Sequence, residues 1–443
     1  MKTTLPYLFA AALLSGAAPV VGQSQTEREK EGLRIHIIKD LNEKERAAVE
    51  YAARFLPLKA GDRGDPYTRP IISAVVQHRI AREGTTRALE EWLPVAPAGA
   101  LPDLYYRVVQ LPWMHRAKEA AALLPFSAAL RDEMTRRAED PGQRLIATDR
   151  AYTPEEWREE CARRNAGFFF THADLLFHSG QRAEALEVME PLREQMRGSS
   201  EFNDLYARAL SANGYRHLLT PFIEECARED AATPGMLDTL RALFAEEGRE
   251  GNFDDHVASL RSREYAERFE ERLARSLIDR DAELFSLESM SGGRVDLSAL
   301  KGKIIVLDFW STWCAPCKAA LPGMQVAVDR FADDPRVAFY FISTMEHNPA
   351  FRKLARDFIT DKGYRLNILF DDTDPATGRH GAIYYSRMKS FGMNGIPHKL
   401  IFDGNGRLRW SSSGYHGKPL ELANEITFLV NLLLAEQEKT SPR

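Results

Sequence analysis

Residues 306–318 read Val-Leu-Asp-Phe-Trp-Ser-Thr-Trp-Cys-Ala-Pro-Cys-Lys. The run from Lys303 to Trp310 is almost continuously apolar, which is typical of a strand buried on both faces of a sheet. Residues 319–328 then follow a helical pattern. The stretch therefore predicts a buried strand, a short turn and a helix, with Cys314 and Cys317 at the start of that helix.

This placement of the two cysteines favours redox chemistry. A thiol in the first turn of a helix lies near unpaired N–H groups and the positive end of the helix dipole, which both favour the thiolate. Cys314 is thus the predicted nucleophile. Cys317, one helical turn further on, is placed to attack a mixed disulfide on Cys314 and release the substrate. Pro316 fits within the first turn, where a missing N–H costs little.

Two structural alternatives exist for this cysteine pair. A zinc site would need a second pair of Cys or His ligands, and the sequence has no second closely spaced pair. An inert disulfide is the other alternative, and a position at an exposed helix start argues against it. The remaining cysteines, Cys161 and Cys226, lie on presumed helices, so we expect buried free thiols there, with a bridge between them as the alternative.

Beyond this motif the pattern is that of an α/β domain. Further strands are expected at 337–343, 366–370, 399–402 and 408–411, and a hairpin is expected at 283–295. Strands that alternate with helices predict a mixed sheet whose last hairpin, turning at 403–406, is antiparallel. The last helix carries apolar residues at helical spacing and should cover one face of the sheet.

Residues 27–280 instead follow a helical pattern throughout. Gly180, Gly214 and Gly248 stand 34 residues apart, the interval of a tetratricopeptide repeat. We therefore expect tetratricopeptide-like repeats over 151–280, and a helical region without a detectable repeat over 27–150. A non-repeating bundle is the alternative. Such arrays commonly bind other chains, so a protein partner on this region is expected.

The first 22 residues have the features of a cleaved signal peptide. Lys2 is followed by an apolar run, Leu5 to Leu14, and then by small residues. Pro6 and Ser15 interrupt this region, which is too short to span a membrane. We expect export through the membrane and a mature chain that does not span it.

Charge excludes one class of partner. The chain has 59 Lys and Arg residues against 64 Asp and Glu residues, a net charge of -5 over 443 residues. This balance provides no basic surface for nucleic acid, so we expect none to bind.

Residues 282–436 resemble the thioredoxin superfamily, and specifically its extracytoplasmic TlpA and ResA branch. The motif at 306–318 carries this resemblance, together with the preceding hairpin and Asp-Leu-Ser-Ala-Leu-Lys-Gly-Lys at 296–303. It implies a thioredoxin-like fold and a periplasmic thiol-disulfide oxidoreductase, more specifically a reductase of disulfides in protein substrates. It further implies a membrane electron-donor protein as partner, and no cofactor or metal besides the redox pair Cys314 and Cys317.

The resemblance also assigns roles to individual residues. Phe-Gly-Met-Asn-Gly-Ile-Pro at 391–397 matches the family segment whose proline is cis and faces the redox pair. Pro397 is then the cis proline and Ile396 offers its backbone to the substrate, with Trp313 and Pro316 as further substrate-binding residues. Asp308 matches the buried acid that moves protons for the resolving cysteine. A charge inside an apolar strand is costly unless it is paired or used.

Three positions depart from the family pattern. The TlpA and ResA branch commonly has Asn at the position of Asp308 and Glu at that of Ala320, so proton handling should be thioredoxin-like and a role dedicated to apocytochrome c is in doubt. His398 replaces the usual Thr after the cis proline. A titratable side chain there could tune the pair, although a solvated strand residue is the commoner outcome.

Two other functions remain open. A thioredoxin-fold peroxidase would place Thr three residues before its reactive cysteine, where this chain has Ser311, and Pro where it has Leu307. Alternatively, the protein binds partners through its helical array and the redox domain is an accessory.

Overall fold

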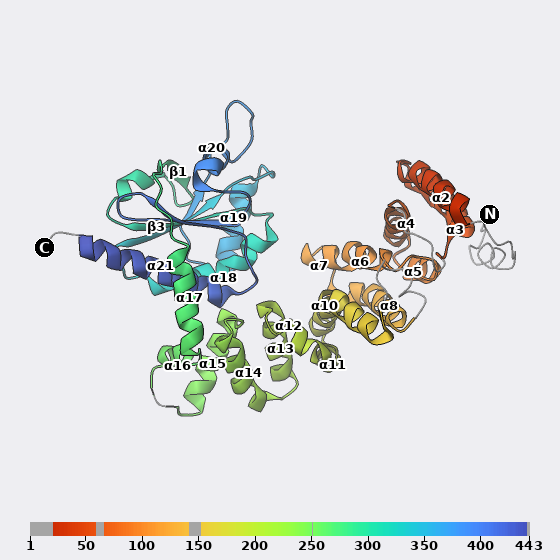
Figure 1. The fold of residues 1–443 in the computed structure, drawn as a ribbon, viewed down its shortest axis with the longest axis horizontal. Coiled ribbons are helices and arrows are strands. Elements are labelled where there is room, and N and C mark those ends of the chain that lie inside the picture. Colours follow the sequence, from red (N-terminus) through yellow and green to blue (C-terminus); the bar gives the residue numbers. More distant parts are fainter. Residues whose placement is uncertain (1–20, 59–65, 141–151, 250, 441–443) are drawn as a thin grey trace. The chain divides into compact units, whose positions relative to one another are not determined.

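The computed structural model describes residues 21–58, 66–140, 152–249 and 251–440 (Figure 1). The chain divides into two compact units at the Met196–Arg197 bond. The signal peptide expected at 1–22 lies almost wholly outside the described residues. Within the described ranges, no helix is both long enough and apolar enough to cross a bilayer.

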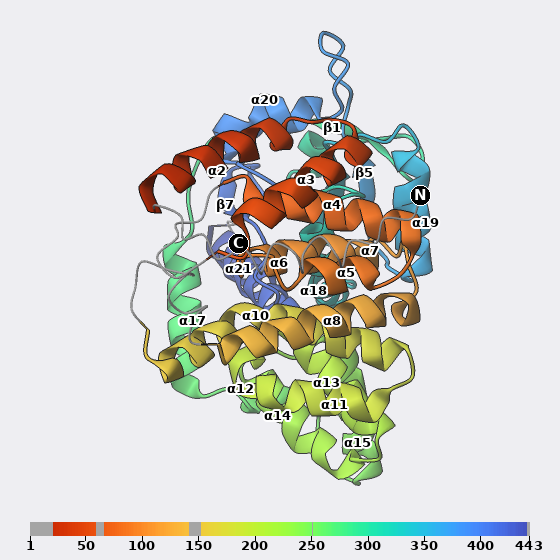
Figure 2. The ribbon, with the colours of Figure 1, turned by 90° about the vertical axis from the view of Figure 1, so that its right-hand side faces the viewer.

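The first unit is helical wherever it is described. Its core is built from apolar residues that several helices contribute. Val75, Leu104 and Leu123, which come from three different helices, are all fully buried. Figure 2 shows α8 and α10 running side by side, and they pack extensively. The helices are α2 (Val21–His36), α3 (Leu41–Phe55), α4 (Thr68–Glu83), α5 (Arg87–Trp92), α6 (Ala100–Tyr105), α7 (Leu111–Met114), α8 (Ala120–Ala138), α10 (Pro154–His178), α11 (Arg182–Met189) and α12 (Arg193–Met196).

The second unit begins with five helices and continues into a sheet. These helices are α13 (Ser200–Ala212), α14 (Leu219–Arg228), α15 (Pro234–Glu246), α16 (Phe253–Ser259) and α17 (Arg263–Arg275). Ser199, Thr233, Asn252 and Ser262 accept hydrogen bonds from first-turn N–H groups at the starts of α13, α15, α16 and α17. Capped starts of this kind explain why the helices begin where they do.

The three phased glycines occupy equivalent backbone positions. Gly180, Gly214 and Gly248 have φ angles of 87°, 81° and 63°, and each follows the end of a helix, α10, α13 or α15. A left-handed residue there suits glycine because it lacks a Cβ. The residues that keep the same phase are buried in every copy: Leu176, Leu210, Phe244, Ala185, Leu219 and Phe253. The glycines therefore mark equivalent helix ends, and the tetratricopeptide assignment itself stays a prediction.

The sheet of the second unit has seven strands in the order β2-β1-β5-β4-β3-β6-β7. β3 lies inside the sheet, parallel to β4 on one side and antiparallel to β6 on the other. The first hairpin, β1 and β2, and the last, β6 and β7, are both antiparallel, so the predicted mixed sheet is confirmed. The strands are β1 (Ser286–Ser289), β2 (Arg294–Asp296), β3 (Ile304–Trp310), β4 (Val337–Ser343), β5 (Ile368–Phe370), β6 (His398–Phe402) and β7 (Leu408–Ser413).

Helices cover both faces of this sheet. One face packs against α18 (Ala315–Arg330), α19 (Phe351–Asp361) and α21 (Pro419–Thr440), and the other packs against α20 (Ala382–Phe391). The expected covering role of the last helix is confirmed because Leu422, Ile426, Leu429 and Leu433 all lie in the first of these cores. Phe269 and Leu273 of α17 join the same core, and α17 lies beside α21 (Figure 1).

α18 and α21 come into close backbone contact at Gly323. A Cβ added to Gly323 would lie 2.9 Å from the Cα of Pro419, and closer still to the carbonyl oxygen of that residue. Both obstacles are backbone, so neither can move aside as a flexible side chain would. The absence of a side chain at 323 therefore sets the distance between the redox helix and the last helix.

We expect Gly323→Ala to lower the free energy of unfolding by about 1–3 kcal/mol, the usual cost of overpacking a core. Gly235→Ala is the matched control, since a Cβ there would meet only ordinary contacts at 3.9 Å. Thermal unfolding followed by circular dichroism measures both variants. Equal midpoints for the two alanine variants would show that α18 and α21 tolerate a wider separation.

Candidate active site

The junction between β3 and α18 places Cys314 at the start of the helix. Cys314 is the N-cap of α18, in an extended backbone conformation. The N–H of Cys317 points at the Sγ of Cys314 over 3.2 Å, and the N–H of Lys318 donates to the Cys314 carbonyl. A sulfur that receives a backbone N–H at the positive end of a helix dipole is stabilised as a thiolate.

Cys314 and Cys317 form a disulfide, with their Cα atoms 5.3 Å apart. Cys314 is 3% exposed and Cys317 is fully buried. The expectation of an exposed first cysteine is therefore wrong for the oxidised state. The reason is that both cysteines belong to the hydrophobic core under α18, and the segment before β6 lies against the sulfur of Cys314. The two intervening residues, Ala315 and Pro316, are exposed.

The segment before β6 brings a cis proline to the redox pair. The Ile396–Pro397 peptide bond is cis, the conformation that the resemblance implies. The carbonyl oxygen of Ile396 lies 4.0 Å from the Sγ of Cys314, while Pro397 is buried and its carbonyl accepts from the N–H of Gly414 over 2.8 Å. Ile396 thus presents backbone beside the reactive sulfur, where an extended peptide could pair with it.

A second segment, the loop after β4, holds the residues that precede Cys314. The Glu346 carboxylate accepts from the N–H and the hydroxyl of Thr312, both over 2.7 Å, and from the hydroxyl of Ser343 over 2.9 Å. The indole of Trp313 donates to the carbonyl of Met345 over 2.9 Å. Sequence reasoning missed Glu346, since a single Glu after a strand carries no local signal of this role.

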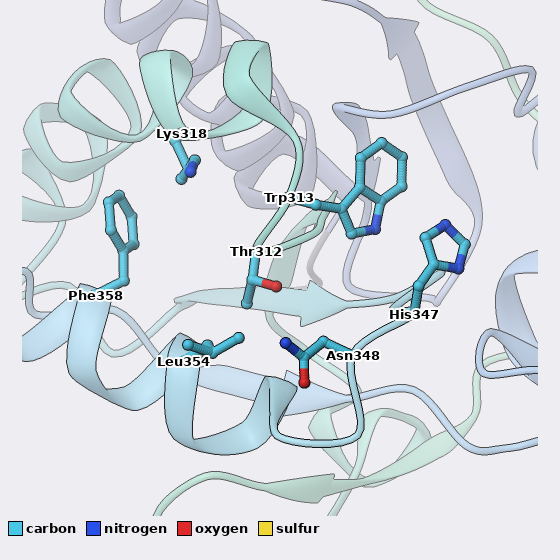
Figure 3. A pocket seen from close by; sticks show the side chains of 7 residues that line it. All are labelled: Thr312, Trp313, Lys318, His347, Asn348, Leu354 and Phe358. Atoms are coloured by element: carbon cyan, nitrogen blue, oxygen red, sulfur yellow. The ribbon is translucent and has the colours of Figure 1, made fainter. Parts of the chain in front are cut away.

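Trp313 is the most exposed aromatic residue of the site. It is 48% exposed and stacks on His347 with ring centroids 5.3 Å apart. A cavity of about 360 Å³ opens beside it (Figure 3). Its lining comes from the redox loop, the loop after β4 and helix α19: Thr312, Trp313, Lys318, His347, Asn348, Leu354 and Phe358. The predicted substrate-binding residue Trp313 therefore borders a largely apolar hollow next to Cys314.

Beneath the redox helix, Asp308 forms an ion pair inside the sheet. Asp308 and Lys399 are direct partners across β3 and β6, each 1% exposed, with Nζ and Oδ1 3.5 Å apart. Asp308 lies two residues from Val306 and two from Trp310, so all three side chains are on the same face of β3. Val306 and Trp310 belong to the hydrophobic core that contains Cys317. Asp308 therefore faces the side of the sheet on which Cys317 lies. Burial raises the pKa of Asp308 to about 6, and Lys399 opposes that rise.

Lys399 was not predicted as a site residue, and its neighbour His398 differs from the expected solvated side chain. His398 is 1% exposed, and its two ring nitrogens contact the hydroxyl oxygens of Ser413 and Ser411 at 2.5 and 2.9 Å. Burial, and then Lys399, lower the pKa of His398 to about 4. The imidazole is therefore neutral near pH 7 and does not place a charge beside the pair.

The other cysteines take no part in this site. Cys161 and Cys226 are buried and neither forms a disulfide, as expected, and burial raises the pKa of Cys161. Ala320, a residue of α18, is fully buried. Within the part of the chain that the structure describes, no cluster of three or more His, Cys, Asp or Glu side chains is arranged to hold a metal ion.

Comparison with known proteins finds similarity in the region that holds this site. Residues 278–411 match the model of the AhpC/TSA family, which is less than half of the chain. This match and the relatives below identify the C-terminal region as a thioredoxin-like domain of the kind found in TlpA- and ResA-type proteins. Glu346, Lys399 and both predicted cysteines lie within the matched residues.

Several bacterial proteins are similar to this region. The chain is 33% identical over 87 residues to thioredoxin-like protein YneN of Bacillus subtilis, a match that covers 20% of this chain and 49% of YneN. It is 54% identical over 44 residues to thiol-disulfide oxidoreductase ResA of the same organism, covering 10% and 25% of the two chains. The chain thus spans about half the length of YneN and a quarter of that ResA.

Solved structures resemble the same region. StoA of Bacillus subtilis is 22% identical, and the match covers 32% of this chain and 96% of StoA with a TM-score of 0.26. A putative protein disulfide isomerase of Bacteroides thetaiotaomicron is 21% identical, covering 37% and 92% of the two chains with a TM-score of 0.30.

We expect the pKa of Asp308 to lie near 6 and to rise in Lys399→Met, because the variant removes a cation that favours the ionised carboxylate. Nuclear magnetic resonance of carboxyl-labelled aspartate in the oxidised protein measures both values. Lys389→Met, on the exposed surface of α20, is the control. An unchanged or lower pKa in Lys399→Met would show that the pair does not interact across the sheet.

The same pKa makes stability depend on pH. Burial raises the pKa of Asp308 in the folded chain above its unfolded value of about 3.9, so the folded state holds this proton more tightly. The resulting stabilisation is complete below about pH 4 and is lost as the pH rises through about 6. Denaturant titrations measure the free energy of unfolding of the wild type and of Asp308→Asn at each pH. The value for the wild type minus the value for the variant should fall as the pH rises from about 4 through about 6. A pH-independent difference would contradict the assignment.

Proposed function

We propose that this chain is a thiol-disulfide oxidoreductase that reduces disulfides in protein substrates through Cys314 and Cys317. The observation that carries the proposal is the redox pair at the start of α18, with the N–H of Cys317 on the sulfur of Cys314 and the carbonyl of Ile396 beside it. Relatives named thiol-disulfide oxidoreductases match parts of this chain. These relatives support thiol-disulfide exchange as the chemistry. That electrons pass from this chain to the substrate disulfide is part of the proposal.

The reaction begins when both cysteines are reduced. The Cys314 thiolate attacks one sulfur of the substrate disulfide, a Cys314–substrate disulfide forms, and the other substrate sulfur leaves as a thiolate that takes a proton. Cys317 then attacks the Sγ of Cys314, which restores the internal disulfide and releases the second substrate thiolate. Two electrons pass from the dithiol to the substrate disulfide.

Asp308 is placed to accept the proton of Cys317 in the second step. Its pKa of about 6 lies close to neutral pH, so the carboxylate is mostly ionised yet binds a proton readily. Lys399 keeps the carboxylate ionised at neutral pH by opposing the effect of burial. The pair therefore provides a base where water has no access.

We place this activity outside the cytoplasm. The signal features of residues 1–22 support export into an oxidising compartment. A disulfide reductase there needs electrons from elsewhere, so a membrane protein that re-reduces Cys314 and Cys317 completes the proposed cycle. The helical regions are then available to bind protein partners.

The peroxidase alternative has less support at this site. A peroxidase would need a hydroxyl that faces the reactive cysteine, and the hydroxyl of Ser311 donates instead to the carbonyl of Thr344. Ser311 is fully buried in that position. Consumption of peroxide by the reduced protein, with loss of the Cys314 thiol, would favour the alternative over disulfide reduction.

We expect Cys314→Ser to abolish reduction of insulin disulfides, because the attacking thiolate is removed and the remaining thiol of the pair, that of Cys317, is fully buried. Cys317→Ala should instead accumulate a covalent Cys314–substrate species, since the resolving thiol is missing. Mass spectrometry under non-reducing conditions detects that species, and the turbidity of reduced insulin reports the activity. Cys161→Ala, which removes a buried thiol outside the site, is the control.

Full insulin-reducing activity in Cys314→Ser would contradict the proposal. An absence of insulin-reducing activity in the reduced wild-type protein would instead leave partner binding by the helical array as the better account of the chain.

A further inference from the structure

The cavity beside Trp313 lies between the redox loop and helix α19 (Figure 3). Trp313 and His347 stand across it from Phe358 and Lys318, with Thr312 between the two sides. Its volume of about 360 Å³ is near the lower end of the range for ligand pockets, so it suits one large side chain better than a whole cofactor. We call this hollow the Trp313 cavity.

The two aromatic walls of the Trp313 cavity are fixed by contacts with the rest of the domain. The indole of Trp313 donates to a backbone carbonyl of the loop after β4 over 2.9 Å, and its ring stacks on that of His347. The ring centroid of Phe358 lies 6.1 Å from that of Trp310 and 6.2 Å from that of Tyr364. Walls that are in place before a ligand arrives lower the entropic cost of binding.

Apolar surface is exposed to solvent at this cavity. Trp313 is 48% exposed and Leu354 is 41% exposed, and both line it. A single apolar residue on a surface needs no explanation, whereas apolar side chains that gather at one hollow are typical of a binding site. A side chain that covers Trp313 and Leu354 gains the free energy of removing their surface from water.

Lys318 makes the cavity selective for one kind of apolar side chain. Its ammonium group lies over the ring of Phe358, 5.6 Å from the ring centroid. A cation is attracted to the face of an aromatic ring. An aromatic ring that enters the cavity therefore offers this ammonium group a second π face, which an aliphatic side chain lacks. A lysine or arginine side chain would instead be repelled by the positive charge of Lys318.

The cavity adjoins the bond that is exchanged. Trp313 directly precedes Cys314, so their Cα atoms are about 3.8 Å apart. A polypeptide that is joined to Cys314, and that lies extended beside the backbone of Ile396, directs its reacting cysteine towards this chain. Residues two positions apart in an extended strand face the same side. The residues two positions before and after the reacting cysteine therefore also face the redox domain.

We infer that the Trp313 cavity is a specificity site for the polypeptide substrate and takes an aromatic side chain two residues from the reacting cysteine. This inference rests on the proposed reductase function. The entering ring packs between Trp313 and Phe358, and the ammonium group of Lys318 contacts its face. Disulfides with an aromatic residue at this spacing are then reduced faster than other disulfides of equal intrinsic reactivity.

Three symmetric disulfides of one short peptide test this inference. Each peptide has a single cysteine, with phenylalanine, leucine or alanine at both positions two residues away from it, so that attack on either sulfur gives the same product. The rate constant for oxidation of the reduced full-length protein is measured with each peptide by mass spectrometry. Parallel reactions with dithiothreitol correct for intrinsic reactivity.

The phenylalanine peptide should react roughly fivefold to twentyfold faster than the alanine peptide, which is part of the gain for complete burial of such a side chain. It should react about twofold to fivefold faster than the leucine peptide, the range for a cation–π contact at an exposed site. Each ratio compares peptides with the same protein, so a change in the reactivity of Cys314 cancels.

Variants of the cavity separate its role from that of the redox pair. Leu354→Trp, which fills the cavity, should bring the phenylalanine to alanine ratio close to one. Leu218→Trp is the matched control, since Leu218 is also 41% exposed and does not line the cavity. Lys318→Met should remove the preference for phenylalanine over leucine, whereas Lys389→Met, on the exposed surface of α20, should retain it.

Equal rates with the phenylalanine and alanine peptides in wild type, or an unchanged ratio in Leu354→Trp, would show that the cavity does not select the substrate. The reductase function would stand in both cases, because the peptides still react. A leucine peptide as fast as the phenylalanine peptide would overturn the aromatic assignment. If none of the peptides oxidises the reduced wild type, the reductase function fails and this inference falls with it.

Discussion

The N–H of Cys317 that points at the sulfur of Cys314 is the contact on which the account depends. It exists because a fully buried strand, β3, ends just before a helix whose N-cap is a cysteine. The strand fixes the position of the helix start, and the helix start concentrates positive potential on one sulfur. Attack on the substrate disulfide requires that sulfur to be anionic, and resolution by Cys317 can follow only after that attack.

The rest of the unit holds this junction in place. Glu346 binds both polar groups of Thr312 just ahead of the cysteine, and Gly323 lets α21 press against the redox helix. Below them, Asp308 and Lys399 form a charged pair that is shielded from water. Such a buried pair is a poor source of stability, so its location under Cys317 is better explained by proton transfer than by folding.

Much of this arrangement follows from local sequence. The apolar run to Trp310 and the Cys-Ala-Pro-Cys motif predict the β3 to α18 junction, and the strand positions after it are confirmed within a few residues. The missed residues share one feature, namely that their roles depend on strand pairing. Lys399 meets Asp308 only through the β3–β6 register, and His398 is buried only because β7 covers it. The exposure of Cys314 was wrong for the same reason, since a distant segment at Ile396 lies over the sulfur.

The reactivity of Cys314 in the reduced protein tests the central claim most directly. The rate of its alkylation by iodoacetamide can be followed as a function of pH by mass spectrometry of the peptide that carries it. The account predicts a curve whose midpoint lies well below the value of about 8.5 for a free cysteine. A midpoint at or above that of a free cysteine would show that the helix start does not activate the sulfur, and the proposed chemistry would then lack its physical basis.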